Sequence, residues 1–83
     1  MKEQDLIDLG FTKRVQESEI FIEDNYHFYE MVFTDNSSLI SNESDAAGED
    51  NWTVSINFDM VITRLEDLKD YISIIKRIQN EDL

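Results

Sequence analysis

Most side chains in this sequence that could perform acid–base or ligand chemistry are carboxylates. The chain has 83 residues, of which 19 are Asp or Glu, one is His and none is Cys. The lack of Cys excludes a thiol nucleophile, a thiolate metal site and a disulfide, and it fits a reducing compartment. General acid–base catalysis requires a carboxyl of raised pKa in an apolar pocket beside an ionised one. Glu30 is the only carboxylate within a strongly apolar segment, and a solvent-facing or edge position explains Glu30 equally well.

The single histidine, His27, does not indicate a catalytic dyad or triad. No recognisable nucleophile motif accompanies it, and a histidine beside tyrosines on a strand is more often structural. We therefore predict that the chain is not an enzyme, and we predict no cofactor.

The polar stretch at residues 42–51 is the first candidate for a cation site, because Ca²⁺ binds several oxygen ligands at once. Its carboxylates are Glu43, Asp45, Glu49 and Asp50, with the amide of Asn42 beside them. Their spacing does not match the EF-hand pattern of alternating ligands, a glycine and a terminal glutamate. We predict a solvated loop without a bound metal.

The charge is distributed unevenly along the chain. Residues 15–63 contain no Lys or Arg, although the formal net charge of the whole chain is −12. A small soluble domain usually carries a net charge of about 2–8 in magnitude, so solubility alone does not require this much. We predict that this span forms an acidic surface that binds a partner through Glu17, Glu19, Glu23, Asp24, Glu30, Glu43, Asp45, Glu49 and Asp50. A generic solvated surface is the alternative, and the sequence favours neither.

This charge also excludes classes of partner. Nucleic acid and anionic lipid headgroups would be repelled, whereas a basic protein surface would be attracted. Trp52 and the aromatic residues of 26–29 suggest a base-stacking platform, but such platforms need a basic groove. We expect a sheet without basic residues, so we predict no direct nucleic-acid binding and no membrane binding. A dimer through the sheet edge or the C-terminal helix stays open.

The pattern of apolar residues predicts an α+β fold in a single domain over residues 1–83. Residues 3–9 read as a short helix that Gly10 ends in a left-handed conformation. A weak pattern favours a strand over 12–17, and we predict a loop or a short edge strand over 18–25. Residues 26–34, dense in aromatic and β-branched side chains, predict a strand that is central in the sheet.

The second half of the chain completes an antiparallel sheet of three to four strands. Residues 38–41 predict a short strand, and 52–58 predict another, because their apolar and polar residues alternate. Thr63 and Glu66 fit a capping box, which opens a long C-terminal helix to about residue 79. Its apolar stripe should cover the sheet face that begins at Trp52. Without a leader or an apolar run of spanning length, we expect a soluble cytoplasmic protein.

Four segments resemble a set of short proteins from Bacteroidota genomes and their phages. The segments are 5–12 (DLIDLGFT), 26–29 (YHFY), 39–42 (LISN) and 65–69 (LEDLK). Size and acidity are also similar in kind to phage anti-CRISPR proteins, specifically inhibitors of RNA-guided, RNA-cutting (type VI) effectors. The resemblance contains no motif that assigns a role to an individual residue.

These observations together lead to an expected function. We expect a phage-type anti-defence protein that binds a basic, nucleic-acid-handling surface of a CRISPR effector nuclease or its guide-RNA complex. Binding would block or misdirect guide or target RNA. The alternative is a small acidic adaptor or immunity protein that binds another cytosolic protein.

Overall fold

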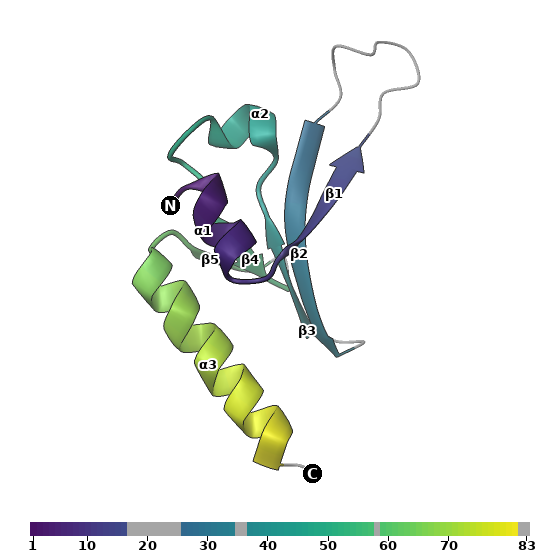
Figure 1. Cartoon of the computed structure of the whole chain (residues 1–83), viewed down its shortest axis with the longest axis vertical. Helices are drawn as coiled ribbons and strands as arrows, with labels where there is room; N and C mark the ends of the chain where they lie inside the picture. The colour runs from purple at the N-terminus through teal and green to yellow at the C-terminus, as the bar shows by residue number, and fades with distance from the viewer. Residues whose placement is uncertain (17–25, 35–36, 58, 82–83) are drawn as a thin grey trace.

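The computed structural model describes residues 1–16, 26–34, 37–57 and 59–81 (Figure 1). They form an α+β fold with one antiparallel sheet of five strands in the order β1-β2-β3-β4-β5, so each strand pairs with the next one in the sequence. The α+β class is confirmed, and the expectation of three to four strands is wrong. The elements are α1 (Glu3–Asp8), β1 (Thr12–Gln16), β2 (Tyr26–Thr34), β3 (Ser37–Ser41), α2 (Ser44–Ala47), β4 (Val54–Ile56), β5 (Met60–Ile62) and α3 (Leu65–Glu81). The expected loop or edge strand at 18–25 lies outside the described residues.

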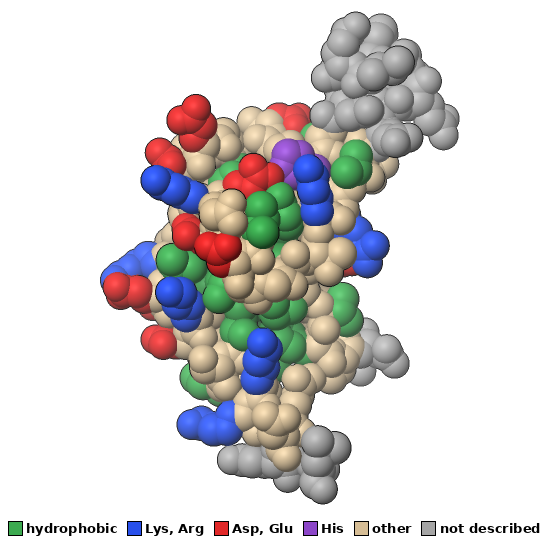
Figure 2. All heavy atoms as spheres, in the orientation of Figure 1, with side chains coloured by type: hydrophobic (Ala, Val, Ile, Leu, Met, Phe, Trp, Pro, Cys, Tyr) green, Lys and Arg blue, Asp and Glu red, His purple; other side chains and the backbone are tan. Residues whose placement is uncertain are grey.

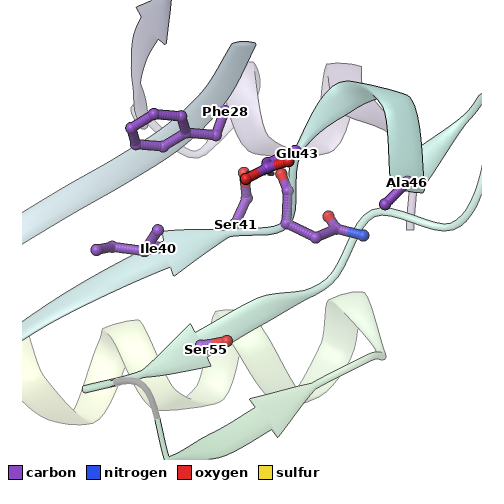
Figure 3. Close-up of a pocket in the computed structure, with 7 residues that line it drawn as sticks. Phe28, Ile40, Ser41, Glu43, Ala46 and Ser55 are labelled. Atoms are coloured by element: carbon purple, nitrogen blue, oxygen red, sulfur yellow. Dashed lines mark hydrogen bonds between the residues drawn. The ribbon is translucent and has the colours of Figure 1, made fainter. Parts of the chain in front are cut away.

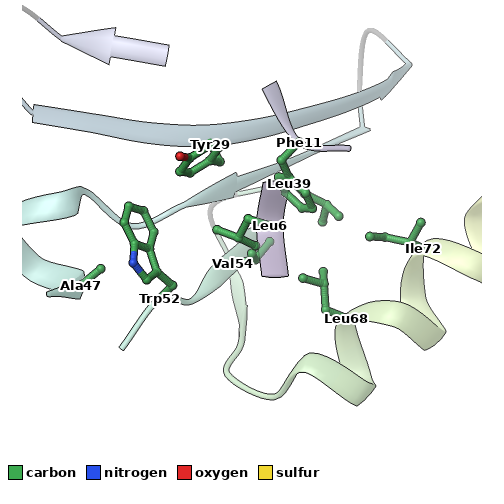
Figure 4. Packing of buried hydrophobic residues seen from close by; sticks show 9 residues of the cluster. All are labelled: Leu6, Phe11, Tyr29, Leu39, Ala47, Trp52, Val54, Leu68 and Ile72. Atoms are coloured by element: carbon green, nitrogen blue, oxygen red, sulfur yellow. The ribbon is translucent and has the colours of Figure 1, made fainter. Parts of the chain in front are cut away.

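One face of the sheet is covered by α1 and α3 (Figure 1). On this face Tyr29, Leu39 and Val54 expose 2%, 0% and 0% of their surface. Leu6 from α1 and Leu68 from α3 are also fully buried in the same cluster (Figure 4). Burial of each such side chain contributes about 1.5–3 kcal/mol relative to exposure. The contacts between these helices and the sheet therefore form much of the core, and Phe11, Ala47 and Trp52 complete it.

The other face of the sheet lies opposite α1 and α3, and we call it the uncovered face because neither helix covers it in the described part of the chain (Figure 1). The register pairs Glu30 with Ile40, Ile40 with Ser55, and Ser55 with Val61. Phe28 lies on the same face, because side chains two residues apart on a strand point the same way. Val61 is 58% exposed. The uncovered face is therefore partly apolar and accessible.

The end of α1 has the conformation that Gly10 predicts. Gly10 has a φ of 95°, and its N–H donates to the Ile7 carbonyl while the Phe11 N–H donates to the Leu6 carbonyl. This pair of bonds is the Schellman motif, in which a left-handed glycine follows the C-cap residue, here Leu9. Phe11 is buried against the core, so the motif also directs the chain from α1 into β1.

The basic residues of β1 overturn one expectation. β1 pairs with β2 and brings Lys13 and Arg14 into the sheet, opposite Tyr29 and Phe28. The expectation of a sheet without basic residues is therefore wrong. The span free of Lys and Arg begins at Val15, one residue after Arg14. Because β1 pairs with β2, Lys13 and Arg14 lie beside residues of that span. β2 is flanked by β1 and β3, so its expected interior position is confirmed.

The region from Trp52 to α3 differs from the expected single strand. β4 covers only Val54–Ile56, and the chain then turns into β5 at Asn57, which has a φ of 50°. Asn tolerates this left-handed conformation better than most residues. β5 has three apolar residues without a polar residue between them, so the sequence did not distinguish this strand from a loop.

The long helix α3 begins later than its sequence pattern indicates. The Leu68 N–H donates to the Arg64 carbonyl, which makes Arg64 rather than Thr63 the N-cap residue. Leu68 and Ile72 are buried in the core, and the helix continues to Glu81. α3 thus covers the sheet face that contains Trp52, as expected. Among the described residues, no helix is both long and apolar enough to cross a membrane.

Candidate functional site

The unequal lengths of β2 and β3 create the most distinctive surface of the described residues. β2 has nine residues and β3 has five, and the two strands pair only from Glu30 onward. Before that point, the N–H of Tyr29 donates to Ser41 Oγ over 2.8 Å, and the N–H of His27 donates to Ser44 Oγ over 3.1 Å. Two side-chain hydroxyls thus accept the hydrogen bonds that backbone carbonyls of a longer β3 would accept. They satisfy backbone groups that would otherwise be costly to bury.

A hollow of about 480 Å³ lies where β3 leaves β2 (Figure 3). Phe28, Ile40 and Ser55 contribute from β2, β3 and β4, all from the uncovered face. Glu43 and Ala46 line it from the chain around α2. The remaining lining residues are Ser41 and Asn42. The hollow therefore combines an apolar floor with a carboxylate at its border.

Residues 43–50, which we call the acidic segment, surround α2 and include four carboxylates but no Lys or Arg. All four carboxylate residues are exposed: Glu43, Asp45, Glu49 and Asp50. By contrast, the molecular face that carries α1 and α3 shows Lys and Arg side chains mixed with Asp and Glu (Figure 2). The negative charge of the acidic segment is thus not balanced within the segment.

Hydrogen bonds from Asn42 close the base of the acidic segment. Asn42 Nδ2 donates to the Asn51 carbonyl over 3.0 Å, and Asn42 Oδ1 accepts from the Thr53 N–H over 3.0 Å. Inside the segment, α2 replaces the expected unstructured loop over 42–51, and Ala47 is fully buried. A four-residue helix leaves no periodic pattern, so the sequence could not indicate it. The carboxylates are therefore held on a folded segment.

Glu30 differs from the carboxylates of the acidic segment because it has an intramolecular partner. Arg14 Nε lies 2.5 Å from Glu30 Oε1, with the two side chains 56% and 21% exposed. An ion pair this close to solvent contributes about 0–1 kcal/mol. The pair neutralises Glu30 on the uncovered face, so a partner would have to compete with Arg14 for this carboxylate.

A second group of titratable side chains joins α1 to β2. Oε2 of Glu3 accepts a 2.6 Å hydrogen bond from the Tyr29 hydroxyl and lies 2.6 Å from Nε2 of His27. Burial, followed by the bond to Glu3, raises the pKa of Tyr29 to about 12. The bond from Tyr29 is the main cause that lowers the pKa of Glu3, and His27 adds to it against the opposing effect of partial burial.

This cluster is suited to holding α1 on the sheet. The His27 ring also lies against Trp52, with centroids 5.7 Å apart, so both its polar and its apolar sides have neighbours. These contacts agree with a structural role for His27. The sequence did not indicate the cluster, because Glu3 and His27 are 24 positions apart and only the fold brings them together.

The predicted site residues divide into three groups. Glu43, Asp45, Glu49 and Asp50 lie together on the acidic segment, and Glu30 lies on the uncovered face beside Arg14. The others, Glu17, Glu19, Glu23 and Asp24, lie outside the described residues. In the part of the chain that the structure describes, no three Asp, Glu or His residues gather into a group that could hold a metal ion.

No family model, curated protein or solved structure matches this chain. The likeness to small phage inhibitors therefore stays a prediction.

Proposed function

We propose that this chain is an inhibitory binding protein that docks the acidic segment on a basic surface of a nucleic-acid-handling protein. More specifically, we propose that this partner is an RNA-guided, RNA-cutting nuclease or its guide-RNA complex. Occupation of its basic channel would block or misdirect guide or target RNA.

One observation carries the proposal. Four exposed carboxylates lie on a folded segment of eight residues that has no basic residue, and a partly apolar hollow adjoins them. Opposite charge accelerates association and selects partners, while apolar contact contributes affinity. Nucleic-acid channels present dense positive charge to phosphates, so their charge is opposite in sign to that of these carboxylates.

The experiment reverses charge at the proposed surface. The test variant carries Glu43→Lys, Asp45→Lys, Glu49→Lys and Asp50→Lys. The control carries four reversals at exposed positions elsewhere, namely Asp8→Lys, Asp59→Lys, Asp67→Lys and Asp70→Lys. Both change the net charge equally, and circular dichroism and thermal melting establish that both are folded.

Binding to purified type VI effectors, with and without guide RNA, and inhibition of their RNA cleavage are then measured across a salt series. The test variant should lose binding and inhibition, and the control should keep both. Affinity of the unmodified chain should fall as salt rises, because salt screens exposed charges. Equal losses in the two variants would show that net charge acts without a defined surface. Unchanged inhibition in the test variant would disprove the proposal.

A further inference from the structure

We propose that the hollow beside the acidic segment accepts an arginine side chain of the partner, and that this arginine is the specific anchor of the interface. The inference rests on the proposed function and names the group that the site recognises. General attraction between opposite charges would orient the two proteins, and the arginine would fix their register.

The floor of the hollow suits the apolar part of an arginine. Phe28 and Ile40 are partly buried on the uncovered face, and both line the hollow (Figure 3). Arginine lays its methylene stem along apolar surface, and its guanidinium stacks on aromatic rings. Lysine has a compact and strongly hydrated charge that stacks less well. An aromatic floor therefore favours arginine over lysine.

The border of the hollow supplies the polar contacts. Within the described part of the chain, the Glu43 side chain has no hydrogen-bond partner, whereas the Asn42 amide is already engaged by Asn51 and Thr53. The Glu43 carboxylate is thus the acceptor available to a guanidinium, which binds carboxylates through paired N–H groups. The Ser55 hydroxyl is a second acceptor among the lining residues.

The chain itself contains the same combination of groups a short distance away. Arg14 lies opposite Phe28 in the register of β1 and β2, and its guanidinium bonds the Glu30 carboxylate on the uncovered face. An arginine from a partner would form a second pair of this kind with Glu43. The volume of about 480 Å³ falls in the range of about 300–1,000 Å³ that is usual for binding sites.

The test uses the full chain and three blocked tripeptides: acetyl-Gly-Arg-Gly-amide, its lysine counterpart and its citrulline counterpart. Citrulline keeps the shape of arginine but has no charge. Amide shifts are followed by ¹H–¹⁵N correlation spectra at constant ionic strength. The arginine peptide should produce saturable shifts at Ser41, Glu43, Ala46 and Ser55. The lysine peptide should bind more weakly and the citrulline peptide should not bind.

Two matched variants separate this site from general attraction. Glu43→Gln and Asp45→Asn each remove one carboxylate from the acidic segment, but only Glu43 lines the hollow. Glu43→Gln should weaken arginine binding about five- to tenfold, while Asp45→Asn should change it less than about twofold. Ala46→Phe, which fills the hollow from α2, should abolish binding without removing charge.

The outcomes distinguish this inference from the proposed function. Equal effects of Glu43→Gln and Asp45→Asn, shifts that lie elsewhere, or no saturable shift would overturn the arginine site. Charge-driven docking would still stand if the fourfold lysine variant lost partner binding. If that variant kept partner binding, the proposed function would fail whatever the peptides showed.

Discussion

The Tyr29 hydroxyl donates a 2.6 Å hydrogen bond to Oε2 of Glu3, although the two residues are 26 positions apart in the sequence. Nε2 of His27 lies 2.6 Å from the same oxygen, so one carboxylate of α1 contacts two side chains of β2. A helix as short as α1 is not stable by itself. Its position therefore depends on this carboxylate and on the burial of Leu6.

Glu3→Gln should lower the free energy of unfolding by about 1 kcal/mol at neutral pH, because it replaces a charged acceptor with a neutral one. The pKa of Glu3 is lowered in the folded chain, so its contribution is full above the unfolded pKa and is lost as pH falls through the folded value. Urea titrations at several pH values measure this difference. The gap between variant and parent should close in acid, and a gap that persists there would contradict the assignment.

Tyr29→Phe should remove an alkaline transition in stability. The pKa of Tyr29 is raised from 10.0 to about 12 in the folded chain, so its contribution is full below the unfolded pKa and is lost as pH rises through the folded value. Between about pH 10 and 12, the parent should therefore lose more stability than Tyr29→Phe loses over the same range. Thermal melting from pH 8 to 12 makes the comparison. Parallel curves for the two proteins would contradict the prediction.

Gly10→Ala tests the left-handed end of α1. Gly10 has a φ of 95°, and a Cβ added there would meet no heavy atom within 4 Å. The cost is therefore conformational rather than steric, about 1–2 kcal/mol of unfolding free energy. Ser73→Ala, at an exposed position of α3, is the control and should be neutral or slightly stabilising. Equal stability of Gly10→Ala and the parent in chemical denaturation would argue against the left-handed conformation.

Features that depend on local pattern could be predicted from the sequence. The dense aromatic and β-branched run of β2 identified a strand, and Gly10 identified the end of α1. The apolar periodicity around Leu68 and Ile72 identified α3. In each case, the sequence signal lies within the element or directly beside it. The element could therefore be predicted without knowing the rest of the fold.

Features that depend on register could not be predicted in this way. The hollow exists because β3 is shorter than β2 and because Ser41 and Ser44 satisfy the backbone of β2. The Arg14–Glu30 pair needs the alignment of β1 with β2. Of the candidate site, the acidic segment could be predicted because its four carboxylates lie within eight consecutive residues. Its apolar neighbours Phe28 and Ile40 come from separate strands, so the sequence did not indicate them.

Asn42→Ala should loosen the acidic segment and weaken partner binding without changing its charge. The Asn42 amide donates to the Asn51 carbonyl and accepts from the Thr53 N–H, so its loss removes two of the hydrogen bonds that join the ends of the segment. Carboxylates on a loosened segment must be ordered again on binding, which reduces affinity. Hydrogen exchange should show faster exchange at the Thr53 amide, and affinity for the basic partner should fall several-fold.

Asn80→Ala, at an exposed position of α3, is the matched control and should leave the exchange of Thr53 and the affinity unchanged. Faster exchange at Thr53 with unchanged affinity would mean that binding does not require an ordered acidic segment. Unchanged exchange would mean that Asn42 does not hold the segment. Faster exchange together with weaker binding would support a surface in which the fold, and not only the charge, positions the carboxylates.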